Sequence, residues 1–390
     1  MDDVKGTYEL LPSGKYRLRY PVGTNEKGQP IRISKTIAAK NDKAAFKELI
    51  LWNMEIEDKG YSELDVITFK NFYHDHWLKA AKDNLEIRTF ESYNSIIIDR
   101  FLKPFDRKKL KEIKPYEIKD IVINAQRQKS VDKYGTELSR ETKKRILSAV
   151  RNLFKIAIEE YQIMKINPCD AVKIPKEKNV KKLTYTPYSS DEIIQLFDVL
   201  TDAPIRSKVI IMTAFFTSAR EGEIAALEEK HFNFETNEVL FEQRIIKQKD
   251  NTLIRLDGLK ATDSKTMIVP DDYMNVIKEF IQENREVRET LNIEDLEHAY
   301  ILGSPEGLPV APESLNRHWA RFIKKHGLRK IRYHDLRHTS ATYLIAQNMP
   351  VKSVQERLGH KDYNTTMNIY AHALKEVDRK ASDALSSFLD

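Results

Sequence analysis

Five basic side chains and a tyrosine in the C-terminal half of the chain have the types needed for chemistry at a phosphate ester. In order along the chain they are Arg220, Lys260, His334, Arg337, His360 and Tyr370. They stand in the short patterns TSAREGEI, KATDS, HDLRHT and LGH, followed by YAH. Guanidinium groups pair bidentately with phosphate oxygens, so two arginines can stabilise the charge that develops during phosphoryl transfer.

The tyrosine hydroxyl is the nucleophile of such a site. Its unperturbed pKa is about 10, and neighbouring cations favour the phenolate that attacks phosphorus. A lysine or histidine can then protonate the departing 5′ oxygen. Because the guanidinium groups supply the positive charge, we expect neither a metal nor another cofactor.

The ordered series resembles the signature of the tyrosine recombinase family, and the segments HDLRHT and LGH are close to that family's usual sequence motifs. The resemblance is specific over about residues 185–390. The remainder is similar only in layout to phage and conjugative-transposon integrases, which have an arm-site sheet domain, a helical core-site domain and a catalytic domain. The resemblance implies a site-specific recombinase that integrates and excises a mobile element.

The resemblance also implies a role for each matching residue. Arg220 and Arg337 would clamp the scissile phosphate, and Tyr370 would form a 3′-phosphotyrosine and release a 5′ hydroxyl. Lys260, on a β-hairpin in the minor groove, would be the general acid. His334 would assist proton transfer, and His360 would donate a hydrogen bond to the phosphate or the transition state. Glu223 would orient the arginine site.

Two positions keep alternatives open. The family commonly has glycine where Ser218 stands, and we expect the small serine to serve the same turn. Because hairpins vary in length, Lys265 and Lys249 are rival candidates for the role given to Lys260.

A zinc site is the sharpest alternative for the HDLRHT segment. His334 and His338 stand four residues apart, as the zinc ligands of some metallohydrolases do. Arg337 would repel a metal, however, and Asp335 is shorter than the usual glutamate. We therefore expect His338 to be structural.

Hydrophobic periodicity predicts the elements that position these residues. We expect strands over 6–37, a helix over 41–57, and further helices near 68–82, 87–101, 115–128 and 139–161. A capping box at Ser189 and Glu192 opens the last domain, which has a hairpin region around 237–270. The predicted fold is multidomain and mainly α with small β parts: an arm-type DNA-binding domain (1–62) of three strands and a helix, a helical core-site DNA-binding domain (63–170), a linker (171–187) and a mixed α/β catalytic domain (188–390).

Basic side chains gather on two predicted surfaces. Charge runs are usually solvated faces, so they favour phosphate contact only in the context of the catalytic motifs. The candidates for DNA contact are Lys15, Arg17, Arg19 and Arg32 on the strands, and Lys143, Lys144 and Arg151 on the last helix of the second domain.

Composition limits the class of protein. There are 65 Lys plus Arg and 59 Asp plus Glu, and the net charge of +6 permits a polyanionic partner without requiring one. The single cysteine, Cys169, makes no disulfide framework. With no signal peptide and no apolar stretch of membrane-spanning length, we expect a bacterial cytoplasmic protein that associates with the nucleoid and not with a membrane.

The segment after Tyr370 predicts an amphipathic helix with an apolar stripe of Leu374, Val377, Ala381, Ala384, Leu385 and Phe388. In the family such a tail docks on a neighbouring protomer, which implies a homotetramer on double-stranded DNA with core and arm sites. An excisionase and a DNA-bending host factor are further expected partners.

Two alternative functions remain. One is a type IB topoisomerase-like relaxing enzyme, although the separate basic N-terminal sheet favours a recombinase. The other is a DNA-binding regulator with a decayed active site, although all six catalytic positions are filled.

Overall fold

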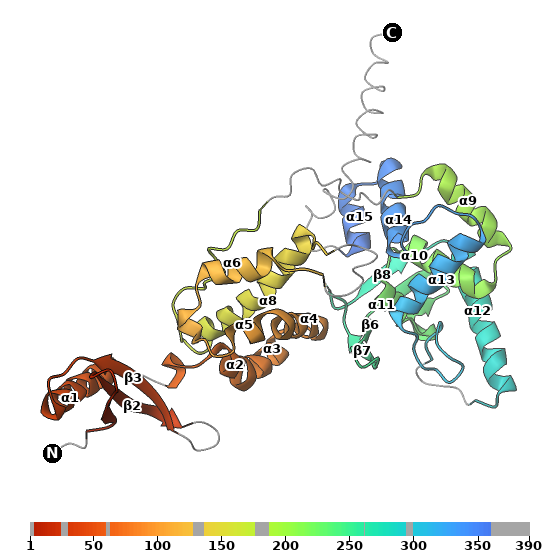
Figure 1. Ribbon diagram of the computed structural model, residues 1–390. Helices are drawn as coiled ribbons and strands as arrows, with labels where there is room; N and C mark the ends of the chain where they lie inside the picture. Colours follow the sequence, from red (N-terminus) through yellow and green to blue (C-terminus); the bar gives the residue numbers. More distant parts are fainter. Residues whose placement is uncertain are drawn as a thin grey trace, which may run out of the picture. The chain divides into compact units, whose positions relative to one another are not determined.

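The computed structural model describes residues 4–24, 30–59, 63–127, 136–175, 187–260, 262–293 and 299–359 of the chain. Contacts divide the chain into two units, residues 1–180 and 181–390 (Figure 1). Both are mainly helical with small sheets, as the sequence predicts. The finer division of the first unit at residue 62 stays a prediction.

A three-stranded antiparallel sheet opens the first unit. Alternation along its middle strand buries Tyr16, Leu18 and Tyr20 on the face that a helix covers. That helix buries Ala45 and Leu49 in return, as its periodicity predicts. The elements are β1 (Thr7–Leu10), β2 (Tyr16–Thr24), β3 (Pro30–Ile37) and α1 (Asp42–Lys59), and the strand order is β1-β2-β3. The turn predicted at 24–28 lies mostly outside the described residues.

The rest of this unit is helical and has its own core. Trp77 is fully buried there and donates to Asn152 Oδ1 at 3.0 Å. The helix predicted over 115–128 ends at Ile123, because Asn124 caps it and Gln126 bridges to Glu137 instead. The elements are η1 (Glu63–Asp65), α2 (Phe69–Phe72), η2 (Tyr73–Trp77), α3 (Leu78–Asn84), α4 (Ile87–Ile97), η3 (Ile98–Leu102), α5 (Lys103–Phe105), η4 (Leu110–Glu112), α6 (Pro115–Ile123) and α8 (Arg140–Glu159).

The second unit is built around the apolar helix α10, which packs against α12, α13 and α14 (Figure 1). The predicted capping box opens α9: Glu192 Oε2 accepts from the Ser189 backbone at 2.8 Å, and Ser189 Oγ accepts from the Glu192 backbone at 3.3 Å. The helices are α9 (Ser190–Thr201), α10 (Ile205–Thr217), α11 (Glu221–Ile224), η5 (Glu229–His231), α12 (Asp271–Thr290), α13 (Pro312–Lys325), α14 (His334–Ala346) and α15 (Val351–Leu358).

The region predicted as a hairpin around 237–270 contains two nested pairings. The outer pair joins β5 to β8 in a sheet of order β4-β5-β8, and β6 and β7 form a separate hairpin between them in sequence. This nesting brings the start of β8 back beside Phe241. The strands are β4 (Phe232–Asn233), β5 (Glu238–Phe241), β6 (Gln243–Lys247), β7 (Leu253–Asp257) and β8 (Lys265–Ile268).

Two expectations from composition can be compared with the structure. Cys169 is a buried free thiol whose pKa is raised by burial to about 12. Within the described ranges, no helix is both long and apolar enough to cross a membrane.

Candidate active site

The turn between α10 and α11 carries the first arginine. Ser218 follows α10 with a left-handed backbone (φ 52°) and is buried. Glycine adopts this conformation most easily, which explains the family's preference at this position. Ser218 is tolerated because it is small and its Oγ donates to Ser340 Oγ at 3.2 Å. Two residues after Ser218, Arg220 is the N-cap of α11.

Glu223 holds Arg220 from one turn farther along α11. Its Oε1 accepts from Arg220 Nη1 at 2.9 Å, and its Oε2 accepts from the Arg220 backbone N–H at 3.0 Å. The carboxylate is 3% exposed, whereas the arginine side chain is 29% exposed. Glu223 therefore fixes the position of the Arg220 guanidinium, and its role at a phosphate stays a prediction.

Arg337 reaches the same place from α14. It is 2% exposed, its Nη1 donates to the Ser218 carbonyl at 2.5 Å, and its Nη2 donates to the Leu358 carbonyl. Arg220 Nη2 donates to the next carbonyl, that of Gly359, at 3.5 Å. Both guanidinium groups therefore converge on the C-terminal end of α15, where the helix dipole favours cations.

The two histidines of α14 lie together. Burial lowers the pKa of His334 to about 4, and its ring centroid is 5.0 Å from that of His338. Asp335, 1% exposed, accepts from Arg332 Nη2 at 2.7 Å. Among the described residues, no group of three or more His, Cys, Asp and Glu side chains could hold a metal ion.

The two lysines around the β7–β8 turn have different surroundings. Lys260 is exposed in that turn, next to the bond from the Leu259 N–H to the Thr262 carbonyl at 2.8 Å. Lys265, the first residue of β8, is close to the arginines, and its Nζ is buried. The rival Lys249 is exposed at the β6–β7 turn. His360 and Tyr370, with the apolar stripe that follows them, lie outside the described residues.

Arg357 is a site neighbour that sequence reasoning missed. Its Nη2 donates to the carbonyls of Phe216 and of Ile268, the latter at 3.3 Å. It thus connects α15 to α10 and β8, and burial lowers the pKa of its guanidinium. The available signal was a basic residue placed directly before Leu358, inside the turn that leads to the LGH segment.

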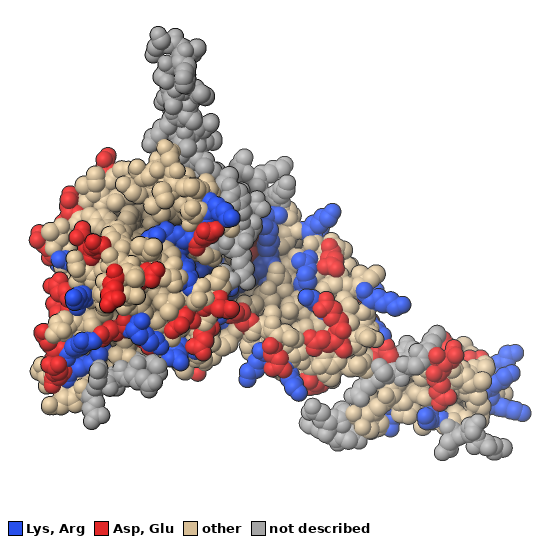
Figure 2. All heavy atoms as spheres, turned by 180° about the vertical axis from the view of Figure 1, so that it is seen from behind, with Lys and Arg blue, Asp and Glu red and all other residues tan. Residues whose placement is uncertain are grey.

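Figure 2 shows one face of the molecule, on which lysines and arginines are interspersed with acidic residues. Arg17 and Arg19 share the outer face of the sheet, and both pair with Glu9, at 3.2 and 2.8 Å. The other candidates are exposed or half-buried: Lys15, Arg32, Lys143, Lys144 and Arg151.

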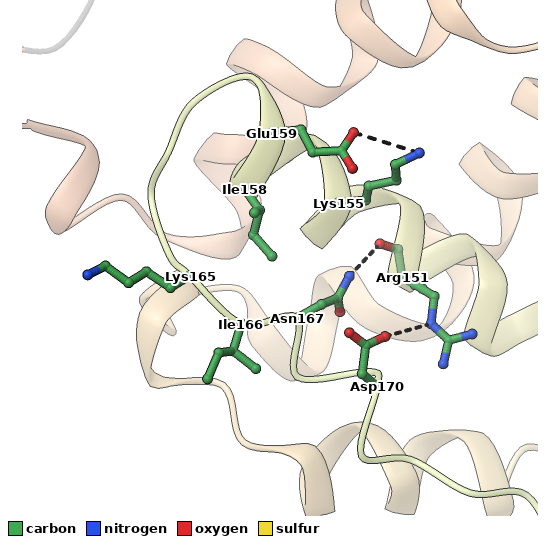
Figure 3. A pocket seen from close by; sticks show the side chains of 8 residues that line it. All are labelled: Arg151, Lys155, Ile158, Glu159, Lys165, Ile166, Asn167 and Asp170. Carbon is green, nitrogen blue, oxygen red and sulfur yellow. Dashed lines mark hydrogen bonds and ion pairs between the residues drawn. The ribbon is translucent and has the colours of Figure 1, made fainter.

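Arg151 has partners within its own domain. Its Nη2 donates to the Cys169 carbonyl at 3.0 Å and its Nε is 3.4 Å from Asp170 Oδ1. Figure 3 shows Arg151 and Asp170 among the residues that line a pocket at the end of α8, with Lys165 directed away from it. Arg151 therefore stabilises this corner of the domain, and its contact with DNA stays a prediction.

Two family models match the chain. The Phage integrase family model matches residues 188–376, and the model of the phage integrase N-terminal SAM-like domain matches residues 68–125. The chain belongs to the tyrosine recombinase family.

Relatives extend this match over nearly the whole chain. A tyrosine recombinase XerC-like protein of Caldanaerobacter subterraneus is 25% identical, with 95% of each chain covered. The integrase of Staphylococcus phage L54a is 24% identical, with 86% of this chain and 97% of the relative covered.

The fold is shared with integrases of known structure. A Tn1549 transposon integrase fragment in complex with transposon right-end DNA has a TM-score of 0.63 at 15% identity, covering 82% of this chain and all of the fragment. A lambda integrase dimer bound to a core site has a TM-score of 0.52 at 18% identity, with 93% and 94% covered.

Proposed function

We propose that this tyrosine recombinase is a site-specific DNA integrase that cuts and rejoins DNA through a 3′-phosphotyrosine, integrating and excising a mobile element. The observation that carries the proposal is the convergence of Arg220 and Arg337 on the carbonyls that end α15. The next residue along the chain is His360, and Tyr370 follows ten positions later. Relatives named integrase and solved DNA complexes of similar fold support the same conclusion.

In the proposed cleavage step, the Tyr370 oxygen attacks the scissile phosphorus. A bond forms between tyrosine and the 3′ phosphate while the bond from phosphorus to the 5′ oxygen breaks. Arg220 and Arg337 bind the non-bridging oxygens, exchanging carbonyl partners for phosphate, and so stabilise the charge of the transition state. His360 adds a further hydrogen bond to the phosphate.

Two proton transfers complete this step. Lys260 gives a proton to the departing 5′ oxygen. With its pKa lowered to about 4, His334 is neutral near pH 7 and can accept the phenol proton, helped by the negative charge of the incoming phosphate. Rejoining is the reverse: a 5′ hydroxyl of the partner strand attacks the phosphotyrosine, and Tyr370 recovers its proton.

The other parts of the chain would deliver DNA to this site. We assign residues 1–62 to arm sites, residues 63–170 to the core site, and the segment after Tyr370 to exchange between protomers of a tetramer. Because these surfaces would contact the DNA backbone, we expect binding that weakens steeply with salt.

A nicked suicide substrate tests the proposal. The full chain is incubated in EDTA with nicked DNA from the ends of its own element, and a covalent protein–DNA adduct is sought on a denaturing gel. We expect an adduct with wild type and with the matched control Tyr343→Phe, whose ring is partly exposed on α14, but none with Tyr370→Phe. If wild type bound the sites and formed no adduct, the proposed reaction would be wrong. An adduct with Tyr370→Phe would show that another residue is the nucleophile.

A further inference from the structure

Lys265 has a buried amine. Its Nζ is shielded from solvent and makes no hydrogen bond to any residue that the structure describes. Its one described aromatic neighbour is Phe241, whose ring centroid lies 5.5 Å away. An unsatisfied buried donor destabilises a fold, so such a group calls for an explanation in function.

The groups around this amine are those of the candidate active site. Arg220 and Glu223 face it from α11, Arg337 from α14 and Arg357 from α15. Its aliphatic chain lies against the end of α15, with Cδ 3.9 Å from the position a side chain at Gly359 would take. Of the described carboxylates, Glu223 is the one that acts on Lys265 beside the three guanidinium groups, and its two oxygens already accept from Arg220.

This excess of positive charge suits an anion. Burial and the charges of the three arginines, opposed by Glu223, together lower the pKa of Lys265 to about 7. A lysine in this place can lose its proton when the site is empty and regain it when negative charge arrives. An arginine in place of Lys265 would remain charged and repel the other three arginines throughout.

We propose that Lys265 is a third binding group for the scissile phosphate, contacting a non-bridging oxygen beside Arg220 and Arg337. The inference rests on the proposed function and extends it, since Lys260 keeps the role of general acid. It follows that engagement of the cleavage site takes up a proton near neutral pH.

Stability measurements separate this role from a structural one. Methionine has nearly the shape of lysine and no polar atom that needs a partner. Because Lys265 Nζ has no hydrogen bond to lose within the described part of the chain, we expect Lys265→Met to melt at or above the wild-type temperature. A clear fall in melting temperature would show that the lysine supports the fold, and would overturn the proposal.

Single-turnover adduct formation by the full chain tests the role itself. The rate is measured on the nicked suicide substrate with protein below half-saturation, from pH 6 to 9. The variants are Lys265→Met, Lys265→Arg and the control Lys278→Met, a lysine exposed on α12. We expect Lys265→Met to slow the reaction by about tenfold or more, and Lys278→Met to change it by less than about twofold.

The pH profile gives a second signature. Below pH 7 Lys265 is already protonated in the free protein. Above pH 7 it is mostly neutral and must take up a proton from solution when DNA binds. The ratio of the wild-type rate to the Lys265→Arg rate should therefore be constant below about pH 7 and fall by about tenfold per pH unit above it. This ratio cancels contributions from Tyr370 and Lys260. A ratio that is flat across the whole range would overturn the proposal.

A sulfur leaving group distinguishes the two lysines. When the 5′ bridging oxygen of the scissile phosphate is replaced by sulfur, the thiolate departs without a proton. We expect this substrate to rescue Lys260→Met and not Lys265→Met. Rescue of Lys265→Met would make Lys265 the proton donor, and a wild-type rate for Lys265→Met on ordinary DNA would leave it no role; either result overturns the inference. If wild type formed no adduct at sites it binds, the proposed function itself would fail.

Discussion

Replacing Glu223 by glutamine tests whether a buried carboxylate holds Arg220 in place. Glu223 is 3% exposed, and its two oxygens accept from the Arg220 backbone at 3.0 Å and from Nη1 at 2.9 Å. Glutamine has one acceptor oxygen, so its amide nitrogen would face an N–H donor. The loss of one charge-assisted hydrogen bond corresponds to about 1.5–3 kcal/mol.

Solvent reduces this cost, because the Arg220 side chain is 29% exposed. We expect Glu223→Gln to lower the free energy of unfolding by about 1–2 kcal/mol, and the melting temperature of the second unit by about 3–6 °C. Since the guanidinium would no longer be fixed, we expect adduct formation on the suicide substrate to slow by about 10- to 100-fold.

Thermal melts check the expected fall in melting temperature, and single-turnover adduct assays check the expected fall in rate. The control is Glu279→Gln on the exposed side of α12. If Glu223→Gln melted with wild type and reacted within about twofold of its rate, the reasoning would be refuted. A lower melting temperature with an unchanged rate would mean that Glu223 stabilises the turn without orienting Arg220.

Three further predictions concern Ser218, His334 and the pair Lys143 and Lys144. Ser218→Val should lower the free energy of unfolding by about 2–3 kcal/mol, because a β-branched residue would have to adopt a left-handed backbone at a buried position. Ser218→Gly should change the free energy of unfolding by less than about 1 kcal/mol. Equal melting temperatures for wild type and Ser218→Val would contradict this prediction. The pKa of His334 in the folded protein, about 4, is below its value in the unfolded chain. As the pH falls, the unfolded chain therefore binds a proton at this histidine before the folded protein does. The free energy of unfolding should fall by about 2 kcal/mol between pH 7 and pH 5 for this reason. Denaturant titrations at both pH values should show a smaller loss for His334→Asn, and an equally steep loss would exclude the histidine as the cause. Reversing the charge of both Lys143 and Lys144 should weaken binding to all DNA sequences alike and reduce the salt slope by about 2, whereas an unchanged slope would place neither lysine at a phosphate.

Much of the local structure was determined by the sequence itself. Strict alternation over Tyr16, Leu18 and Tyr20 predicted the buried face of the first sheet, because side chains alternate along any strand. The Ser189–Glu192 pair predicted the start of α9, since a capping box involves only neighbouring residues. The ordered motifs also sufficed for the family, because residue type and order are properties of the chain alone.

Tertiary structure decided which of these residues meet. Arg220 and Arg337 come from helices far apart in the chain, and only the packing of α14 against α10 and α15 brings both to the end of α15. The sequence could not decide whether Lys260 or Lys265 lies in the active site, because the register of the hairpin strands, which the sequence does not give, fixes which residues face inward. The pairing of Phe241 with Lys265 settles that Lys265 lies beside the arginines. Local patterns report contacts between near neighbours, whereas the charge and burial of an active site depend on long-range packing, which no short segment encodes.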